Sequence, residues 1–200
     1  MGLTVEKCLQ AWTNSLRQMN TKADIVFFGD SLTYYGDFSS VFPGKVVCNL
    51  GLRGDTIQGM IDRVVQVKIL EPKAVYLMAG INDIATSTIE SFKEQYRLLI
   101  NSLQAELPTV SLIVQGLLPV NNEYFHLSCN NADICLLNNC IKDLVSEFGL
   151  YYLDLYSLYE IEGELPVDFT LDGIHINKSA YKMWYNTILR NNSKSRLNER

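Results

Sequence analysis

Five short, continuous apolar runs recur along this chain of 200 residues, and helical patterns separate most of them. The runs occupy residues 25–28, 45–50, 74–79, 111–115 and 151–155. Continuous apolar runs, as opposed to alternating ones, are typical of strands that are covered on both faces. This alternation therefore predicts an α/β, doubly wound domain with a parallel sheet of five strands and helices on both of its faces.

Helical spacing of apolar residues and local stop signals give the expected helices. Residues 56–69 form one expected helix before Pro72, and Ser87 with Glu90 resembles a capping box for a helix that ends near Pro108. Further helices are expected at residues 4–20, at 132–148, and from Asn177 to about residue 190. We expect a single domain over residues 1–200, with its core at about 23–190 and a frayed polar tail at 191–200.

Charge and cysteine usage narrow the classes of partner. The net charge of -5 would repel phosphates and anionic headgroups, which argues against nucleic-acid or membrane-surface binding and favours a small-molecule partner. The five cysteines have no Cys-x-x-Cys spacing, so reduced thiols and no metal site are expected. Residues 1–20 lack a signal-peptide pattern, and no apolar stretch reaches about 18 residues. These features predict a cytoplasmic protein without stable membrane insertion.

Three candidate functional groups directly follow predicted strands. Ligands of parallel α/β sheets bind beyond the carboxyl ends of the strands, where Ser31, Gly54 and Asn82 are expected. Ser31 is a candidate nucleophile or a helix N-cap. Gly54 lies either in a simple turn or where its N–H can meet an oxyanion, and Asn82 forms either an Asx-turn or an amide donor to negative charge.

A base candidate comes late in the chain, where Asp172 precedes His175 by three residues. If the segment turns, the carboxylate can reach the Nδ1–H of the imidazole and leave Nε2 free as a base. The second histidine, His126, lies in a polar stretch and is expected either on the surface or at the edge of a pocket. A nucleophile, a base, its orienting acid and two oxyanion donors together supply the parts of an acyl-transfer site.

Four blocks in this order resemble the SGNH hydrolases, also called GDSL esterases and lipases. They are Gly29-Asp30-Ser31-Leu32, the segment 49–56 with Gly54, Gly80-Ile81-Asn82-Asp83 and Asp172-Gly173-Ile174-His175. The segment 49–56 and the later Gly116-Leu117-Leu118-Pro119 look most like the branch that contains the α subunits of platelet-activating-factor acetylhydrolase.

The resemblance implies a flavodoxin-like three-layer αβα sandwich without metal or organic cofactor. It implies Ser31 as nucleophile, His175 as base and Asp172 as its partner. It also implies an oxyanion hole made by the N–H groups of Ser31 and Gly54 and the side chain of Asn82.

The expected function is hydrolysis of a carboxylic ester of a small acyl group such as acetyl, because the chain leaves little length for a lid. Lysophospholipase and acyl-CoA thioesterase activities stay open, as do a non-catalytic binding module and a flavodoxin-like nucleotide or flavin binder. A homodimer is also left open. Residues expected to contact the substrate are Asp30, Tyr34, Tyr124, His126 and Phe169.

Overall fold

The fold is built on one parallel sheet, as the apolar runs predict. A computed structural model of the chain describes residues 5–125 and 128–198. Its strands run in the order β2-β1-β3-β4-β5, and all neighbouring pairs are parallel. The strands are β1 (Ile25–Gly29), β2 (Val47–Gly51), β3 (Ala74–Met78), β4 (Ser111–Gln115) and β5 (Tyr151–Leu153). The five expected strands are therefore confirmed, with shifts of one or two residues at five of their ten ends.

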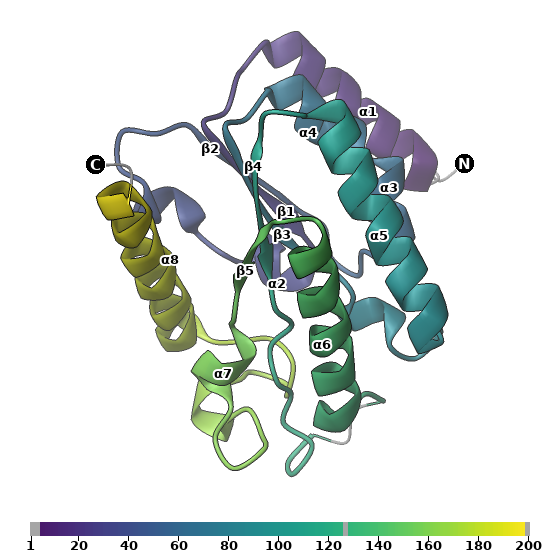
Figure 1. The fold of residues 1–200 in the computed structure, drawn as a ribbon, viewed down its shortest axis with the longest axis vertical. Coiled ribbons are helices and arrows are strands. Elements are labelled where there is room, and N and C mark those ends of the chain that lie inside the picture. Colours follow the sequence, from purple (N-terminus) through teal and green to yellow (C-terminus); the bar gives the residue numbers. More distant parts are fainter. Residues whose placement is uncertain (1–4, 126–127, 199–200) are drawn as a thin grey trace.

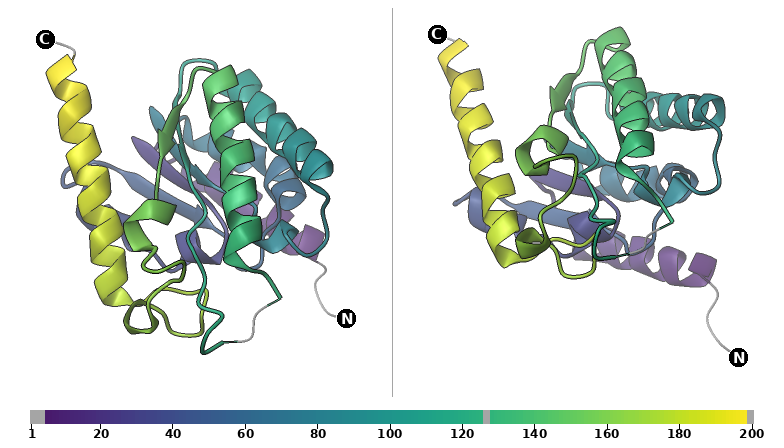
Figure 2. Two further views of the ribbon diagram at one scale, coloured as in Figure 1. Left: turned by 60° about the horizontal axis from the view of Figure 1, so that its bottom comes forward. Right: turned by 90° about the horizontal axis from the view of Figure 1, so that it is seen from below.

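Helices cover the sheet on both faces, which confirms the three-layer αβα arrangement (Figure 1). On one face lie α1, α4, α5 and α6, and α8 lies on the other face with α7 beside it (Figure 2). The α-helices are α1 (Val5–Met19), α2 (Ser31–Tyr34), α3 (Ile57–Asp62), α4 (Val64–Leu70), α5 (Ile89–Glu106), α6 (Asn131–Glu147), α7 (Tyr156–Tyr159) and α8 (Lys178–Asn198). Short 3-10 helices are η1 (Phe38–Val41), η2 (Ile81–Asp83) and η3 (Val167–Phe169).

The core forms where the central strands meet these helices. All five residues of β1 are buried, because a strand in the middle of a two-faced sheet has no side exposed to water. In α8 the residues Ala180, Trp184 and Ile188 are fully buried at a spacing of four, which directs one stripe of the helix toward the sheet. Among the described residues, no helix has the length and apolarity to cross a membrane.

The helix expected at 56–69 is interrupted in the structure. It begins as expected after Thr56, whose side chain accepts a hydrogen bond from the N–H of Gly59. At Arg63 the backbone leaves the helical region (φ -116, ψ 14), and α4 starts with the next residue. Apolar spacing does not reveal this break, because residues on both sides of it keep the same buried face.

Two helix ends also differ from the expected ones. The N-cap of α5 is Thr88, whose hydroxyl accepts from the N–H of Ser91, so the assignment of Ser87 as the cap is wrong. The last helix extends to Asn198, and the prediction of a frayed tail from residue 191 is therefore wrong as far as residue 198. Asn192 accepts a hydrogen bond from the Tyr76 hydroxyl, which ties the start of this extension to the sheet.

The strand order locates the site. The chain passes from β1 outward to β2, then returns across β1 to β3, so the direction of winding reverses between β1 and β3. In open α/β sheets a ligand crevice forms at this reversal, outside the carboxyl ends of the strands. Ser31 follows β1 and Asn82 follows β3, which brings both candidates to this position.

Candidate active site

Ser31 lies at the first turn of the short helix α2, directly beyond β1. Asp30 is the N-cap, and its carboxylate accepts a hydrogen bond of 2.9 Å from the N–H of Leu32. The helix packs so closely on β2 that a Cβ built on Gly51 would lie 2.2 Å from the backbone nitrogen of Tyr34. A glycine at position 51 is thus needed for α2 to hold Ser31 at the end of the sheet.

His175 faces Ser31 from a tight loop near the end of the chain. Its Nε2 lies 2.9 Å from the Ser31 Oγ, and its Nδ1 lies 2.7 Å from Oδ2 of Asp172. The other carboxylate oxygen of Asp172 accepts from the N–H groups of Ile174 and His175, at 3.1 and 2.8 Å. Asp172 therefore fixes both the backbone turn and the imidazole ring.

The loop geometry affects the acidity of Asp172. Partial burial works to raise the pKa of this carboxyl, but the hydrogen bonds from His175 and Ile174 outweigh it and hold the pKa below its ordinary value. The ionised carboxylate favours the imidazole tautomer with the proton on Nδ1. In that tautomer Nε2 is free to accept the hydroxyl proton of Ser31.

Gly54 and Asn82 stand on neighbouring loops at the same edge. Gly54 has a φ of +71°, a conformation that glycine adopts without steric cost. The side-chain amide of Asn82 donates a hydrogen bond of 2.8 Å to the carbonyl oxygen of Asp55. A primary amide carries two N–H donors, and the second donor of Asn82, which bonds to no other described residue, can bind a ligand.

A buried ion pair lies beneath these loops. The Arg63 side chain is 1% exposed, and its Nε lies 2.7 Å from Oδ2 of Asp55. Its other nitrogens donate to the carbonyl oxygens of Leu50 at 2.8 Å and Gly29 at 3.1 Å. The guanidinium also lies over the Phe28 ring, 4.3 Å from its centroid. One side chain thus ties the ends of β1 and β2 to the loop that carries Asp55.

A cavity of about 560 Å³, which we name the catalytic cavity, lies between the candidate nucleophile, the candidate base and the loops of Gly54 and Asn82. Four of the predicted site residues line it, namely Ser31, Gly54, Asn82 and His175. Asp172 lies behind His175 and reaches the cavity only through the imidazole ring. In the part of the chain that the structure describes, no group of three or more His, Cys, Asp or Glu side chains could hold a metal ion.

Asp30 is not a substrate contact, contrary to the prediction. Its side chain is fully buried, with Oδ1 on the N–H of Leu32 and Oδ2 without a hydrogen-bond partner in the described structure. Burial raises the pKa of this carboxyl to about 7. Its position is set by the N-cap of α2, which the sequence alone does not distinguish from an exposed turn.

The predicted aromatic contacts also lie elsewhere. Tyr34, Tyr124 and Phe169 do not line the catalytic cavity, and Tyr34 and Tyr124 are exposed at the surface. His126 lies outside the described residues.

Several wall residues of the catalytic cavity were not predicted, and these are Arg53, Ile81, Ile84, Ala85, Ser128, Cys129 and Ile174. Arg53, Ile81 and Ile174 directly precede Gly54, Asn82 and His175, so adjacency to the motif residues is a signal that could have found them.

Comparison with known proteins identifies the class that this fold and site define. The family model of the GDSL-like lipase/acylhydrolase family matches residues 27–183, and the chain belongs to this family. It is accordingly a carboxylic ester hydrolase.

Solved structures share the fold at low sequence identity. A Streptococcus pneumonia protein provisionally described as a platelet activating factor superposes with a TM-score of 0.80 at 20% identity, over 90% of each chain. A GDSL-like lipase from Bacteroides thetaiotaomicron has a TM-score of 0.76 at 18% identity, over 94% of this chain and 98% of its own. The acetyl xylan esterase AlAXEase has a TM-score of 0.70 at 20% identity, over 82% and 96%. These likenesses show the fold.

One curated relative is a longer protein. The N-acylneuraminate cytidylyltransferase of Streptococcus agalactiae is 23% identical over 170 residues, which make up 82% of this chain. The chain spans only 37% of the length of that relative.

The Arg63–Asp55 pair gives a stability prediction. Burial raises the pKa of Asp55 and lowers that of Arg63, so each charge depends on the other. Arg63→Met leaves the buried carboxylate uncompensated and is expected to lower the free energy of unfolding by about 3–5 kcal/mol. The matched control is Arg97→Met, which breaks the more exposed pair with Glu147 and is expected to lower the free energy of unfolding much less, because solvent screens this pair. Equal decreases in the free energy of unfolding of the two variants, measured by urea unfolding, would contradict the structural role assigned to Arg63.

The buried carboxyl of Asp30 gives a pH prediction. Its folded-state pKa of about 7 lies above the ordinary value of 3.8, so the folded protein keeps a proton that the unfolded chain loses between these pH values. The contribution of this carboxyl to the free energy of unfolding therefore falls as the pH rises between these two pKa values, by up to about 1.4 kcal/mol per pH unit. Asp30→Asn keeps the acceptor for Leu32 and is expected to gain stability over the wild type as pH increases from about 5 to 8. A constant difference across unfolding experiments in this range would refute the prediction.

Proposed function

We propose that the protein is a serine esterase that hydrolyses esters of a small acyl group such as acetyl through an acyl-enzyme. The observation that carries the proposal is the continuous chain of hydrogen bonds from Ser31 to His175 to Asp172, at 2.9 and 2.7 Å. A nucleophile held by a base that is itself oriented by a carboxylate is the arrangement that activates a hydroxyl for acyl transfer.

The first half of the reaction forms the acyl-enzyme. His175 Nε2 accepts the Ser31 proton as Oγ attacks the ester carbonyl carbon, and the carbonyl oxygen becomes an oxyanion. The donors proposed for this oxyanion are the N–H groups of Ser31 and Gly54 and the free amide N–H of Asn82. The tetrahedral intermediate then collapses, the bond from carbon to the alcohol oxygen breaks, and His175 passes its proton to that oxygen.

The second half of the reaction hydrolyses the acyl-enzyme and regenerates the free enzyme. His175 takes a proton from a water molecule, which attacks the acyl carbon of the Ser31 ester and forms a second oxyanion. Collapse of this intermediate releases the carboxylic acid, and the proton on His175 returns to the Ser31 Oγ. Asp172 stays ionised throughout and stabilises the imidazolium that forms in each half.

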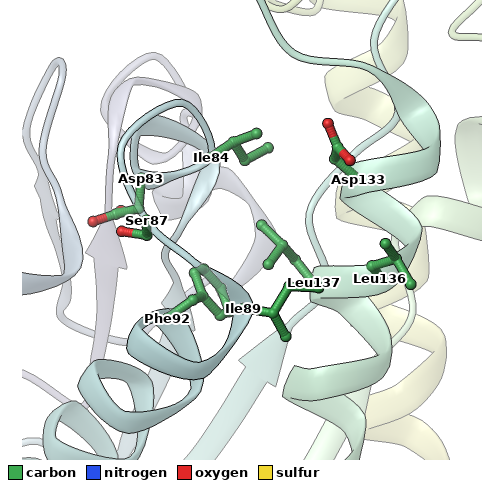
Figure 3. A pocket seen from close by; sticks show the side chains of 8 residues that line it. All are labelled: Asp83, Ile84, Ser87, Ile89, Phe92, Asp133, Leu136 and Leu137. Carbon is green, nitrogen blue, oxygen red and sulfur yellow. The ribbon is translucent and has the colours of Figure 1, made fainter.

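The walls of the cavity support a short acyl group. Ile84 lines the catalytic cavity and also a second pocket of about 150 Å³ between α5 and α6. Figure 3 shows Ile84 projecting toward α6 above Ile89, Phe92 and Leu137 of that pocket. We propose that this shared side chain separates the two hollows and thereby limits the length of an acyl chain on Ser31.

The names of two relatives support an acylated sugar as substrate, less directly than the cavity supports a short acyl group. One structural neighbour is described as an acetyl xylan esterase, and the longer curated relative is named for a sugar acid, N-acylneuraminate, whose acyl group is an amide and not an ester. Both names concern those proteins. Lysophospholipids and acyl-CoA thioesters are the competing substrates. A panel of hydrolysis assays that tests acetylated sugars should include them.

Two substitutions test the catalytic roles. Ser31→Ala removes the nucleophile and is expected to abolish hydrolysis of p-nitrophenyl acetate and labelling by a fluorophosphonate. Asn82→Ala removes one oxyanion donor and is expected to lower kcat by about 100- to 1000-fold. A fluorophosphonate that fails to label the wild type would favour a non-catalytic binding module, and full activity in Ser31→Ala would exclude Ser31 as nucleophile.

A third substitution tests the acyl preference. Ile84→Ala removes the side chain shared by the two cavities, so longer acyl chains gain room beside Ser31. On p-nitrophenyl esters of two to eight carbons, we expect the wild type to prefer acetate and the variant to shift its optimum to longer chains. The matched control is Ile161→Ala, at an exposed position that lines neither cavity. An unchanged optimum in Ile84→Ala would contradict the role of Ile84.

A further inference from the structure

A second large cavity adjoins the catalytic one, between α8, the segment after α2 and the loop that carries His175. Its volume is about 750 Å³, and we name it the α8 cavity. Its polar and aromatic lining includes Tyr35, Tyr181, Tyr185, Lys178 and Lys182, together with the carboxylates of Asp37 and Asp172.

The two cavities meet at His175, which lines both of them. Tyr35 stands beside it on the α8 side, with its ring perpendicular to the imidazole at a centroid distance of 5.6 Å. Arg53, from the wall of the catalytic cavity, lies over the same Tyr35 ring at 5.8 Å. His175 and Tyr35 therefore lie between the two cavities. A ligand that extends beyond its acyl group would pass along these two side chains.

We propose that the α8 cavity binds the alcohol portion of the ester, and that this alcohol is a polyhydroxylated ring such as a sugar. The inference rests on the proposed esterase function, and it adds where the alcohol portion of the ester binds. The carbonyl oxygen must lie toward Gly54 and Asn82, on the catalytic-cavity side. The alcohol oxygen must lie within reach of His175 Nε2, because that atom protonates it as it leaves. The body of the alcohol is then directed past His175 toward the α8 cavity.

The chemistry of the wall selects the class of alcohol. Tyr35 is 48% exposed, and the part of its ring that Arg53, Tyr34 and His175 leave uncovered can meet the C–H surface of a sugar ring. The hydroxyls of Tyr181 and Tyr185 are already bonded to the backbone, to Leu32 O and Asp37 N, so these residues present mainly their rings. Lys178 and Lys182 are exposed, form no salt bridge with the described residues, and each carry three N–H donors for hydroxyl groups. Apolar faces combined with a few polar groups are typical of a small-molecule site.

The test compares two acetate esters with the same acyl group, a mono-O-acetylated methyl glucoside and methyl acetate. The measured quantity is the ratio of their kcat/KM values, which cancels any effect on the shared acyl-transfer chemistry. We expect this ratio to fall about tenfold in Tyr35→Ala and in Lys182→Ala, mainly through a higher KM for the sugar ester. Lys182 is included because, unlike Tyr35, it has no ring contact with His175.

The control is Tyr151→Ala, which removes an equally exposed tyrosine (51%) that lines neither cavity and is expected to keep the ratio. A ratio that stays unchanged in both cavity variants overturns the proposal, and so does a wild type that prefers methyl acetate to the sugar ester. In either case, continued hydrolysis of methyl acetate shows that the proposed esterase function still stands. A wild type that hydrolyses neither ester and resists the fluorophosphonate instead refutes the esterase function itself.

Discussion

The buried ion pair between Arg63 and Asp55 is the interaction on which the geometry of the candidate site depends. It joins the carbonyl ends of β1 and β2 to the loop that presents Gly54, and the carbonyl of Asp55 fixes the amide of Asn82. A buried pair contributes little net stability, because desolvation offsets most of its attraction. The pair matters here because it fixes positions: the ends of β1 and β2 and the loops of Gly54 and Asn82 are all held through Arg63 and Asp55.

The parallel sheet and the positions of the site residues could be predicted from the sequence because both follow from strong local signals. Apolar runs of four to six residues mark strands that are covered on both faces, and topology then requires their carboxyl ends to lie at one edge. Ser31, Gly54 and Asn82 each come within a few residues of such an end. The spacing of Asp172 and His175 is likewise local, since one carboxylate oxygen closes the turn and the other meets the ring.

The features that could not be predicted are set by tertiary contacts. The break at Arg63 occurs where a guanidinium turns inward to carbonyls 13 and 34 residues away in sequence, which no helical periodicity records. Asp30 lies in a strand-to-helix turn, where polar residues are usually exposed, yet it is fully buried. Likewise, the sequence analysis names Tyr34 as a substrate contact, whereas the packed loops place the ring of Tyr35 against His175.

The residues proposed for catalysis and those proposed for recognition of the alcohol come from different parts of this fold. The proposed nucleophile and oxyanion donors are held by strand ends and by a buried ion pair, where a shift of one side chain would disturb several others. Part of the wall of the α8 cavity comes from α8, on which exposed residues such as Lys178 and Lys182 can change without disturbing the core. His175 is the residue that belongs to both cavities. A scaffold of this kind can keep its acyl-transfer geometry while α8 and the neighbouring loops determine which alcohol is accepted.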